Sequence, residues 1–112
     1  MNRSKTSPHG GIRIVHRPQE GKTIHETNQI RIAFPNGYEA SIIYGALAYS
    51  TNANGERITA PLGDTEFAST VEVQITRPNG NPVPFKDGGD VKGFVSLTEL
   101  FQILNWVATQ KD

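Results

Sequence analysis

Residues 29–44, QIRIAFPNGYEASIIY, decide the fold of this chain. Apolar and polar side chains alternate on both sides of the tripeptide Pro35-Asn36-Gly37. Alternation with a period of two is typical of a strand that buries one face, and Pro-Asn-Gly favours a tight turn with a left-handed glycine. The stretch therefore predicts a β-hairpin with Arg31, Glu39 and Ser41 on its solvent side. Its apolar face is expected to contain Ile30, Ile32, Phe34, Tyr38, Ala40, Ile42 and Tyr44.

Three shorter segments are also expected to be extended. Residues 12–16 alternate in the same way and predict a first strand that ends before a proline. Residues 70–76 alternate as well and lead into a second Pro-Asn-Gly tripeptide at residues 78–80. Residues 83–85 are expected at a sheet edge, because the prolines within and beside them lack an amide donor.

The C-terminal segment predicts an α-helix. Ser96 and Glu99 have the spacing of a capping box, which satisfies free amides at a helix start. Apolar residues then recur at helical spacing as far as Thr109, and they form a stripe of Leu97, Leu100, Phe101, Leu104, Val107 and Ala108. A helix of this length is marginal alone, so we expect the stripe to pack on the face formed by Ile30, Ile32 and Phe34. The expected fold class is α+β, an antiparallel β-sheet of four to six strands with one C-terminal α-helix on one face.

Length and composition indicate one soluble domain. The chain has 112 residues and no cysteine, and it lacks an apolar run of about 18 residues that could span a membrane. Residues 1–25 carry five of the eleven basic residues and one of the eleven acidic residues. We expect residues 1–11 to form a disordered basic N-terminal arm and residues 12–112 to form a single α+β domain in the cytoplasm.

The sequence contains no recognisable catalytic or metal-binding motif. His16, Glu20, His25 and Glu26 are close in sequence but match no compact ligand spacing. No Gly-x-Ser-x-Gly nucleophile motif occurs. No spacing pairs two of the loop carboxylates for acid–base chemistry, namely Asp64, Glu66, Asp87 and Asp90. We therefore expect a protein that is not an enzyme and that uses no metal and no cofactor.

Residues 45–66, the longest stretch without a period, are the first place to look for a binding surface. Long loops in compact domains are usually functional or mobile, so a binding loop and a hairpin tip without a partner both fit. Trp106 lies off the centre of the helix stripe and fits either an interface anchor or a shield for the core edge. The expected protein-binding residues are Tyr49, Asn52, Asn54, Glu56, Arg57, Asp64, Glu66 and Trp106.

Two segments resemble parts of a group of small bacteriophage-encoded proteins of uncharacterised function. NGYEASII at residues 36–43 is similar to the Asn-Gly-Tyr hairpin strand of that group, and DVKGFVSLTELFQIL at residues 90–104 is similar to its helix opening with Leu-Thr. The basic arm and the long middle loop depart from the group. The resemblance implies a small, non-enzymatic viral protein made in the cytoplasm of a bacterial host, and it assigns no functional residue.

The favoured hypothesis is a binding protein that inhibits a host defence or regulatory protein complex, for example an anti-CRISPR protein. An acidic body that can cover a basic surface agrees with this hypothesis. Two alternatives stay open: a virion or assembly protein that forms a homo-oligomer, and a nucleic-acid-binding accessory protein that uses the basic arm. Five cations over 25 residues are sparse for such an arm, so the expected partner is a host protein rather than nucleic acid or a membrane.

Overall fold

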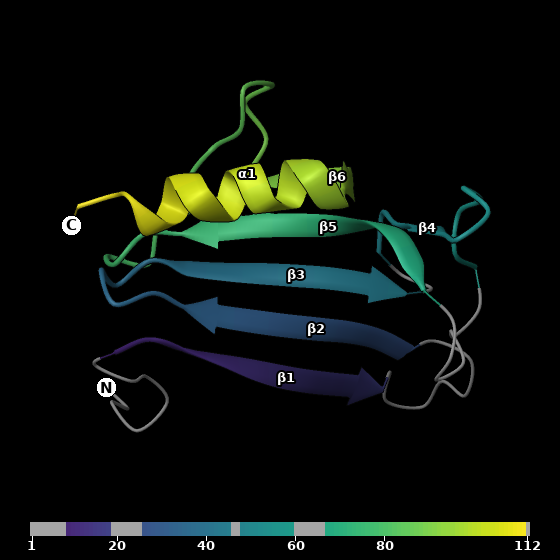
Figure 1. The fold of residues 1–112 in the computed structure, drawn as a ribbon, viewed down its shortest axis with the longest axis horizontal. Coiled ribbons are helices and arrows are strands. Elements are labelled where there is room, and N and C mark those ends of the chain that lie inside the picture. Colours follow the sequence, from purple (N-terminus) through teal and green to yellow (C-terminus); the bar gives the residue numbers. More distant parts are fainter. Residues whose placement is uncertain (1–8, 19–25, 46–47, 60–66, 112) are drawn as a thin grey trace.

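Six strands and one helix form the part of the chain that the structure, a computed structural model, describes: residues 9–18, 26–45, 48–59 and 67–111. The elements are β1 (Gly11–Pro18), β2 (Glu26–Ala33), β3 (Glu39–Gly45), β4 (Thr51–Asn52), β5 (Ala68–Thr76), β6 (Val91–Ser96) and α1 (Leu97–Ala108). All strand pairs are antiparallel, in the order β1-β2-β3-β5-β4, and β6 also pairs with β5. Because α1 lies across one face of this sheet (Figure 1), the predicted α+β class is confirmed.

The β2–β3 hairpin has the predicted register and turn. Apolar residues of the two strands share one face, through the cross-strand pairs Ile30–Ile42 and Ile32–Ala40. In the turn, Gly37 N donates to Phe34 O at 2.9 Å, and Gly37 has a φ of 91°, which glycine adopts without steric cost. The second Pro-Asn-Gly turn repeats this geometry, with a φ of 90° at Gly80.

The sheet has an apolar face towards α1 and a polar face away from it. The polar face is predicted to be solvated, but Ser41 is buried there, and Gln29 Nε2 donates to its Oγ at 2.7 Å. Arg31 and Glu39 form an ion pair on the same face. The predicted solvent position of Ser41 is therefore wrong, because a neighbouring side chain supplies the hydrogen bond that a buried hydroxyl needs.

α1 begins at the predicted N-cap. Ser96 Oγ accepts a hydrogen bond from Glu99 N at 3.2 Å. The Glu99 carboxylate forms an ion pair with Lys92 Nζ of β6 at 3.2 Å. The helix therefore joins β6 without a loop, since the last residue of the strand is also the cap of the helix.

α1 lies over β5 and β6 and not over the predicted seat on β2. Leu100 and Val107 are buried against the sheet, and Ile103 and Leu104 pack beside them. Three predicted members of the stripe are instead exposed: Leu97, Phe101 and Ala108. The apolar arc of this helix is wider than the surface it buries, and its Ile103 side faces Ile75, Val83 and Phe85, so the opposite side of the arc stays uncovered.

The β2–β3 turn also holds the C-terminal end of α1. Asn36 Nδ2 donates to Val107 O at 2.9 Å and to Gln110 O at 2.8 Å. Asn36 Oδ1 accepts from Tyr38 N at 3.1 Å within its own turn. Carbonyl groups at the end of a helix lack intrahelical donors, so one amide side chain connects the central hairpin to the helix.

β6 is a strand that the sequence pattern does not predict. Between its pairs with β5 it has one more residue than β5, as the register Val71–Val95 and Val73–Lys92 shows. This β-bulge lies at Gly93-Phe94, and Phe94 has a φ of 53°. The extra residue puts the apolar side chains out of alternation, and alternation is the signal from which strands are predicted.

Candidate protein interface

Tyr49, Arg57 and Phe94 form a group of large side chains at the surface, here called the Tyr49 cluster. The guanidinium carbon of Arg57 lies 4.9 Å from the centroid of the Tyr49 ring. The Phe94 ring lies 5.9 Å from the same centroid at an interplanar angle of 54°. Tyr49 is 51% exposed, and the other two side chains are exposed as well. Arginine stacked on tyrosine is common at the energetic centres of protein interfaces.

The main chain of Tyr49 is held on both sides. Tyr49 N donates to Glu72 Oε1 at 2.9 Å, and Tyr49 O accepts from Phe94 N at 2.9 Å. A Cβ atom added to Gly93 would lie 2.6 Å from the Cβ of Tyr49, so only glycine lets β6 approach this closely. These contacts fix the position from which the Tyr49 ring projects.

The Tyr49 cluster lies on the sheet face away from α1. Val71 and Val73 of β5 pack into the core on the helix side. Glu72 lies between them, and successive side chains of a strand point to opposite faces. The Glu72 carboxylate that binds Tyr49 N therefore projects from the polar face.

Phe94 has a strained main chain. It is the only non-glycine residue with positive φ among those that the structure describes. An aromatic residue in this conformation costs on the order of 1–3 kcal/mol, and such strain is concentrated at functional sites. The bulge directs the Phe94 ring towards Tyr49, which is a recognised use of bulges near binding sites.

The predicted loop residues have different roles in the structure. Asn52 Oδ1 accepts from Asn54 N at 2.9 Å and from Glu56 N at 3.0 Å. Asn52 therefore shapes the turn that returns the chain to Arg57. Asn54 and Glu56 are exposed at its tip. The remaining predicted loop residues, Asp64 and Glu66, lie outside the described residues.

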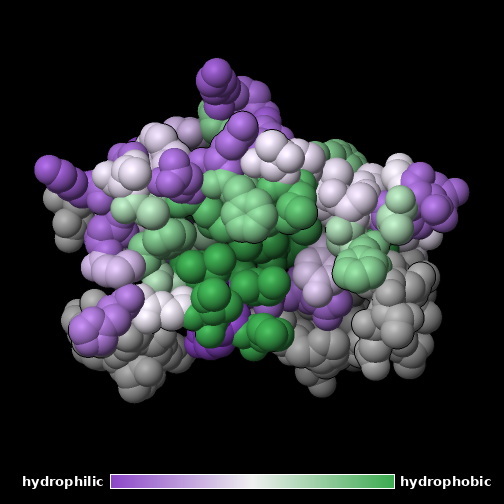
Figure 2. Space-filling view, in the orientation of Figure 1, coloured by the Kyte–Doolittle hydropathy of each residue, from purple (hydrophilic) through white to green (hydrophobic). Residues whose placement is uncertain are grey.

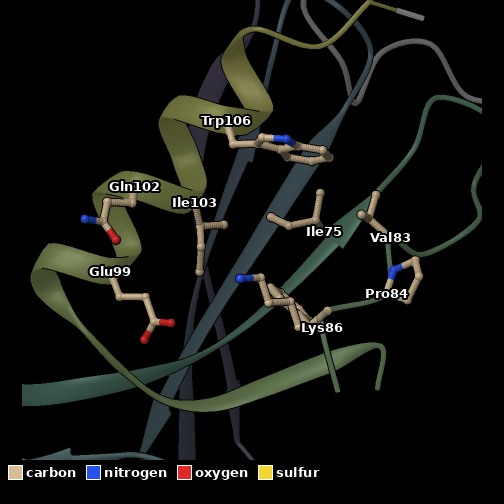
Figure 3. A pocket seen from close by; sticks show the side chains of 9 residues that line it. Ile75, Val83, Pro84, Lys86, Glu99, Gln102, Ile103 and Trp106 are labelled. Carbon is tan, nitrogen blue, oxygen red and sulfur yellow. The ribbon is translucent and has the colours of Figure 1, made fainter. Parts of the chain in front are cut away.

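Trp106 lies on the helix side of the sheet, away from the Tyr49 cluster. Its ring meets the Tyr38 ring edge-on, with centroids 6.5 Å apart. It forms one wall of an open pocket of about 330 Å³ (Figure 3), which is also lined by Ile75, Val83, Pro84, Phe85, Lys86, Glu99, Gln102 and Ile103. Trp106 covers the core at Ile75 and is still exposed over part of its surface, so its position agrees with both predicted roles.

The apolar face of the sheet continues beyond α1 onto β1 and β2. Ile12 and Ile14 of β1 are exposed, and their cross-strand neighbours Ile32 and Ile30 are half-buried. Figure 2 shows apolar side chains gathered below the helix as one continuous area. We call this surface the open face and define it by the floor, Ile12, Ile14, Ile30 and Ile32, and by the adjacent helix residues Leu97, Phe101 and Leu104.

Five of these exposed residues are missing from the predicted interface: Phe94, Ile12, Ile14, Leu97 and Phe101. The alternation at Ile12 and Ile14 does predict an apolar face, but it carries no information on what covers that face. Phe94 has a weaker signal, a glycine before an aromatic residue in an apolar segment, which is compatible with a bulge.

Among the described residues, no group of three or more His, Asp or Glu side chains is placed to hold a metal ion. Two of the residues in the histidine–glutamate grouping, Glu20 and His25, lie outside that part of the chain. No helix in the described ranges is long and apolar enough to cross a membrane. No protein-family model matches this sequence, and no curated protein or solved structure shows significant similarity to it.

Proposed function

We propose that this protein is a non-enzymatic binding protein that inhibits another protein by covering part of its surface with the Tyr49 cluster. The observation that carries this proposal is the geometry of Tyr49. Its half-exposed ring contacts both Arg57 and Phe94, and its main chain is hydrogen-bonded through both N and O.

A side chain that is ordered before binding gives affinity at a lower entropic cost. Immobilising a flexible side chain in an interface costs roughly 0.5–1.5 kcal/mol. The Tyr49 ring is already restricted by its two neighbours, so less of this cost remains when a partner binds. The strain at Phe94 supports the same interpretation, because strained main chain is concentrated at binding and active sites.

The chemistry of the cluster describes the surface that it would cover. Tyr49 and Phe94 would fill an apolar depression, and Arg57 would form a bidentate contact with a carboxylate at its rim. The resemblance to small phage proteins supports a host defence or regulatory complex as the class of partner. The runner-up function is self-association, which the open face favours. Nucleic-acid binding depends on Arg3 and Lys5, which lie outside the described residues.

The test is affinity capture from a bacterial host lysate, with quantitative mass spectrometry of the captured proteins. We expect the wild type to capture one protein in stoichiometric amount and Tyr49→Ala to reduce that capture at least about tenfold, as for an interface hot spot. Alanine keeps the Cβ that Gly93 packs against, so the fold should persist, and circular dichroism checks this.

Two control variants sharpen the test. Arg57→Ala should also weaken capture, because it removes the cation over the ring. Lys111→Ala removes an exposed cation elsewhere and should leave capture unchanged. Equal capture by the wild type and Tyr49→Ala would show that the interface lies elsewhere and would overturn the proposal.

A further inference from the structure

The open face is a contiguous apolar patch, whereas the exposed apolar residues of an ordinary protein surface are scattered singly. Ile12 and Ile14 are 72% and 79% exposed, and Leu97 and Phe101 of α1 are 64% and 62% exposed. At the apolar area that burying a Leu, Ile or Phe side chain removes from water, these four alone offer on the order of a few hundred Å². Contiguous apolar patches of a few hundred Å² mark binding sites on soluble proteins. Among the described residues, nothing covers this surface.

The helix residues of the open face form a wall beside its floor. Leu100 and Val107 point towards the sheet, and Ile103 and Trp106 point to the side of Val83. At 100° per residue, Leu97 and Phe101 lie on the opposite flank of α1 from Ile103 and Trp106. That flank overlooks the β2 and β1 side of the sheet, because β6 and the segment around Val83 lie on the other side (Figure 1). The open face is therefore a step between the floor and a helical wall.

We propose that a second copy of this chain covers the open face. In this dimer, β1 and β2 of the two protomers pack face to face about a two-fold axis, and the β1 edge of each protomer lies against the Leu97–Phe101 wall of its partner. Two packed sheets are about 10 Å apart, and an α-helix with its side chains is roughly 10–12 Å across. A second sheet thus fits the height of the step that α1 makes.

The charge distribution favours a copy of the same surface. The charged residues of β1 and β2 whose side chains the structure describes, Arg13 and Arg31, alternate with the isoleucines and so lie on the opposite face. The only charged residue of α1 is Glu99, which pairs with Lys92 and lies on the Trp106 side. A two-fold interface packs the same surface of each protomer against its copy, which is favourable for an apolar surface on which no described side chain carries a charge.

The geometry of β1 and β2 and the exposed apolar area of the open face agree with a second copy of the chain as its partner. β1 and β2 pair without a bulge over eight residues, so the floor is a regular strand pair, and two such twisted sheets pack face to face at about 30°. A stable interface needs about 800 Å² from each partner. The four exposed side chains supply part of that area, and the half-buried Ile30, Ile32 and Leu104 with the adjoining main chain would supply the rest.

The proposal is tested on the full chain by sedimentation equilibrium over a range of protein concentrations. We expect the wild type to approach twice its monomer mass of 12.3 kDa at high micromolar concentration. Ile14→Lys should remain a folded monomer at the same concentration, because dimerisation would bury an unpaired lysine charge in the interface. Tyr49→Ala should still dimerise, which separates this test from that of the proposed function.

The absence of cysteine allows a second, independent measurement. Treated with a flexible bismaleimide, Ile14→Cys should cross-link into a covalent dimer because both copies of residue 14 lie in the interface, whereas Ala53→Cys, on an exposed turn on another part of the molecule, should do so much more slowly. A wild type that stays monomeric at high micromolar concentration would overturn the proposal, and so would a dimer that survives Ile14→Lys.

Discussion

The two ends of the sheet differ in how far their apolar face is covered: the β1 end is open, and the β5 end lies beneath α1. Ile14, Ile30, Ile42 and Val73 are successive cross-strand partners in β1, β2, β3 and β5. Exposure falls from 79% at Ile14 to 4% at Ile42 and 0% at Val73. All four are β-branched aliphatic residues, so the difference comes from what lies above them. Alternation in a strand therefore identifies an apolar face, and the position of one helix decides how much of that face becomes core.

The largest difference between the two ends is expected when a carboxylate is placed at each end of the row from Ile14 to Val73. Val73→Asp would bury an unpaired charge beneath α1, at a cost comparable to the roughly 5–15 kcal/mol that stabilises a whole domain. We expect this variant to lose cooperative thermal unfolding by circular dichroism. Ile14→Asp should keep a folded core, since its side chain stays in water. A cooperative transition in Val73→Asp close to that of the wild type would contradict the packing described here.

The sequence predicts the strands and the hairpin well because their signals are local. Pro35-Asn36-Gly37 and the alternation around it determine turn and register within sixteen residues, and Ser96 determines the helix start within four. The position of α1 is a different kind of property. Leu97, Phe101 and Leu100 belong to one wide apolar arc. Which part of the arc is buried depends on its contact with the segment from Val83 to Phe85, and the periodicity of the helix carries no information on that contact.

The candidate site is predicted in part for the same reason. Tyr49 and Arg57 are found because they lie in a long loop. Phe94 is missed because it approaches Tyr49 only through the bulge at Gly93, a pairing between β6 and a loop more than forty residues away. Ser41 is misplaced because its burial depends on Gln29 in the neighbouring strand.

An intermediate loss in the free energy of unfolding is expected when the contact between the β2–β3 turn and α1 is removed. Asn36→Ala removes the hydrogen bonds to Val107 O and Gln110 O and leaves partly buried carbonyls without this donor, which costs about 1–3 kcal/mol. The matched control is Asn79→Ala, because Asn79 occupies the same turn position in the second Pro-Asn-Gly and its Oδ1 bonds only within that turn, to Asn81 N at 2.9 Å.

Chemical denaturation measures both free energies of unfolding. The loss in Asn36→Ala beyond that in Asn79→Ala is the contribution of the contact between hairpin and helix. Equal losses would mean that Asn36 stabilises its turn alone and that the apolar contacts of Leu100 and Val107 are sufficient to hold α1 on β5 and β6.

The smallest effects come from removing one methylene group along the row. Ile42→Val should cost about 0.5–1.5 kcal/mol, the usual value for a buried site. Ile30→Val should cost less, and Ile14→Val should change the unfolding free energy by less than about 0.5 kcal/mol, as for a surface position. Denaturant titration of the three variants at low micromolar concentration tests whether cost follows exposure.

Repeating the series at high protein concentration identifies what covers the open end. If a second copy covers the floor, Ile14→Val becomes more destabilising as concentration rises, because only the native dimer buries that side chain and its stability depends on concentration. Ile42→Val would keep the same cost within the protomer, since α1 already covers it. A cost at Ile14 as large as that at Ile42 and independent of concentration would instead mean that part of the same chain lies on the floor. That result would remove both the open end of the row and the reason for a dimer.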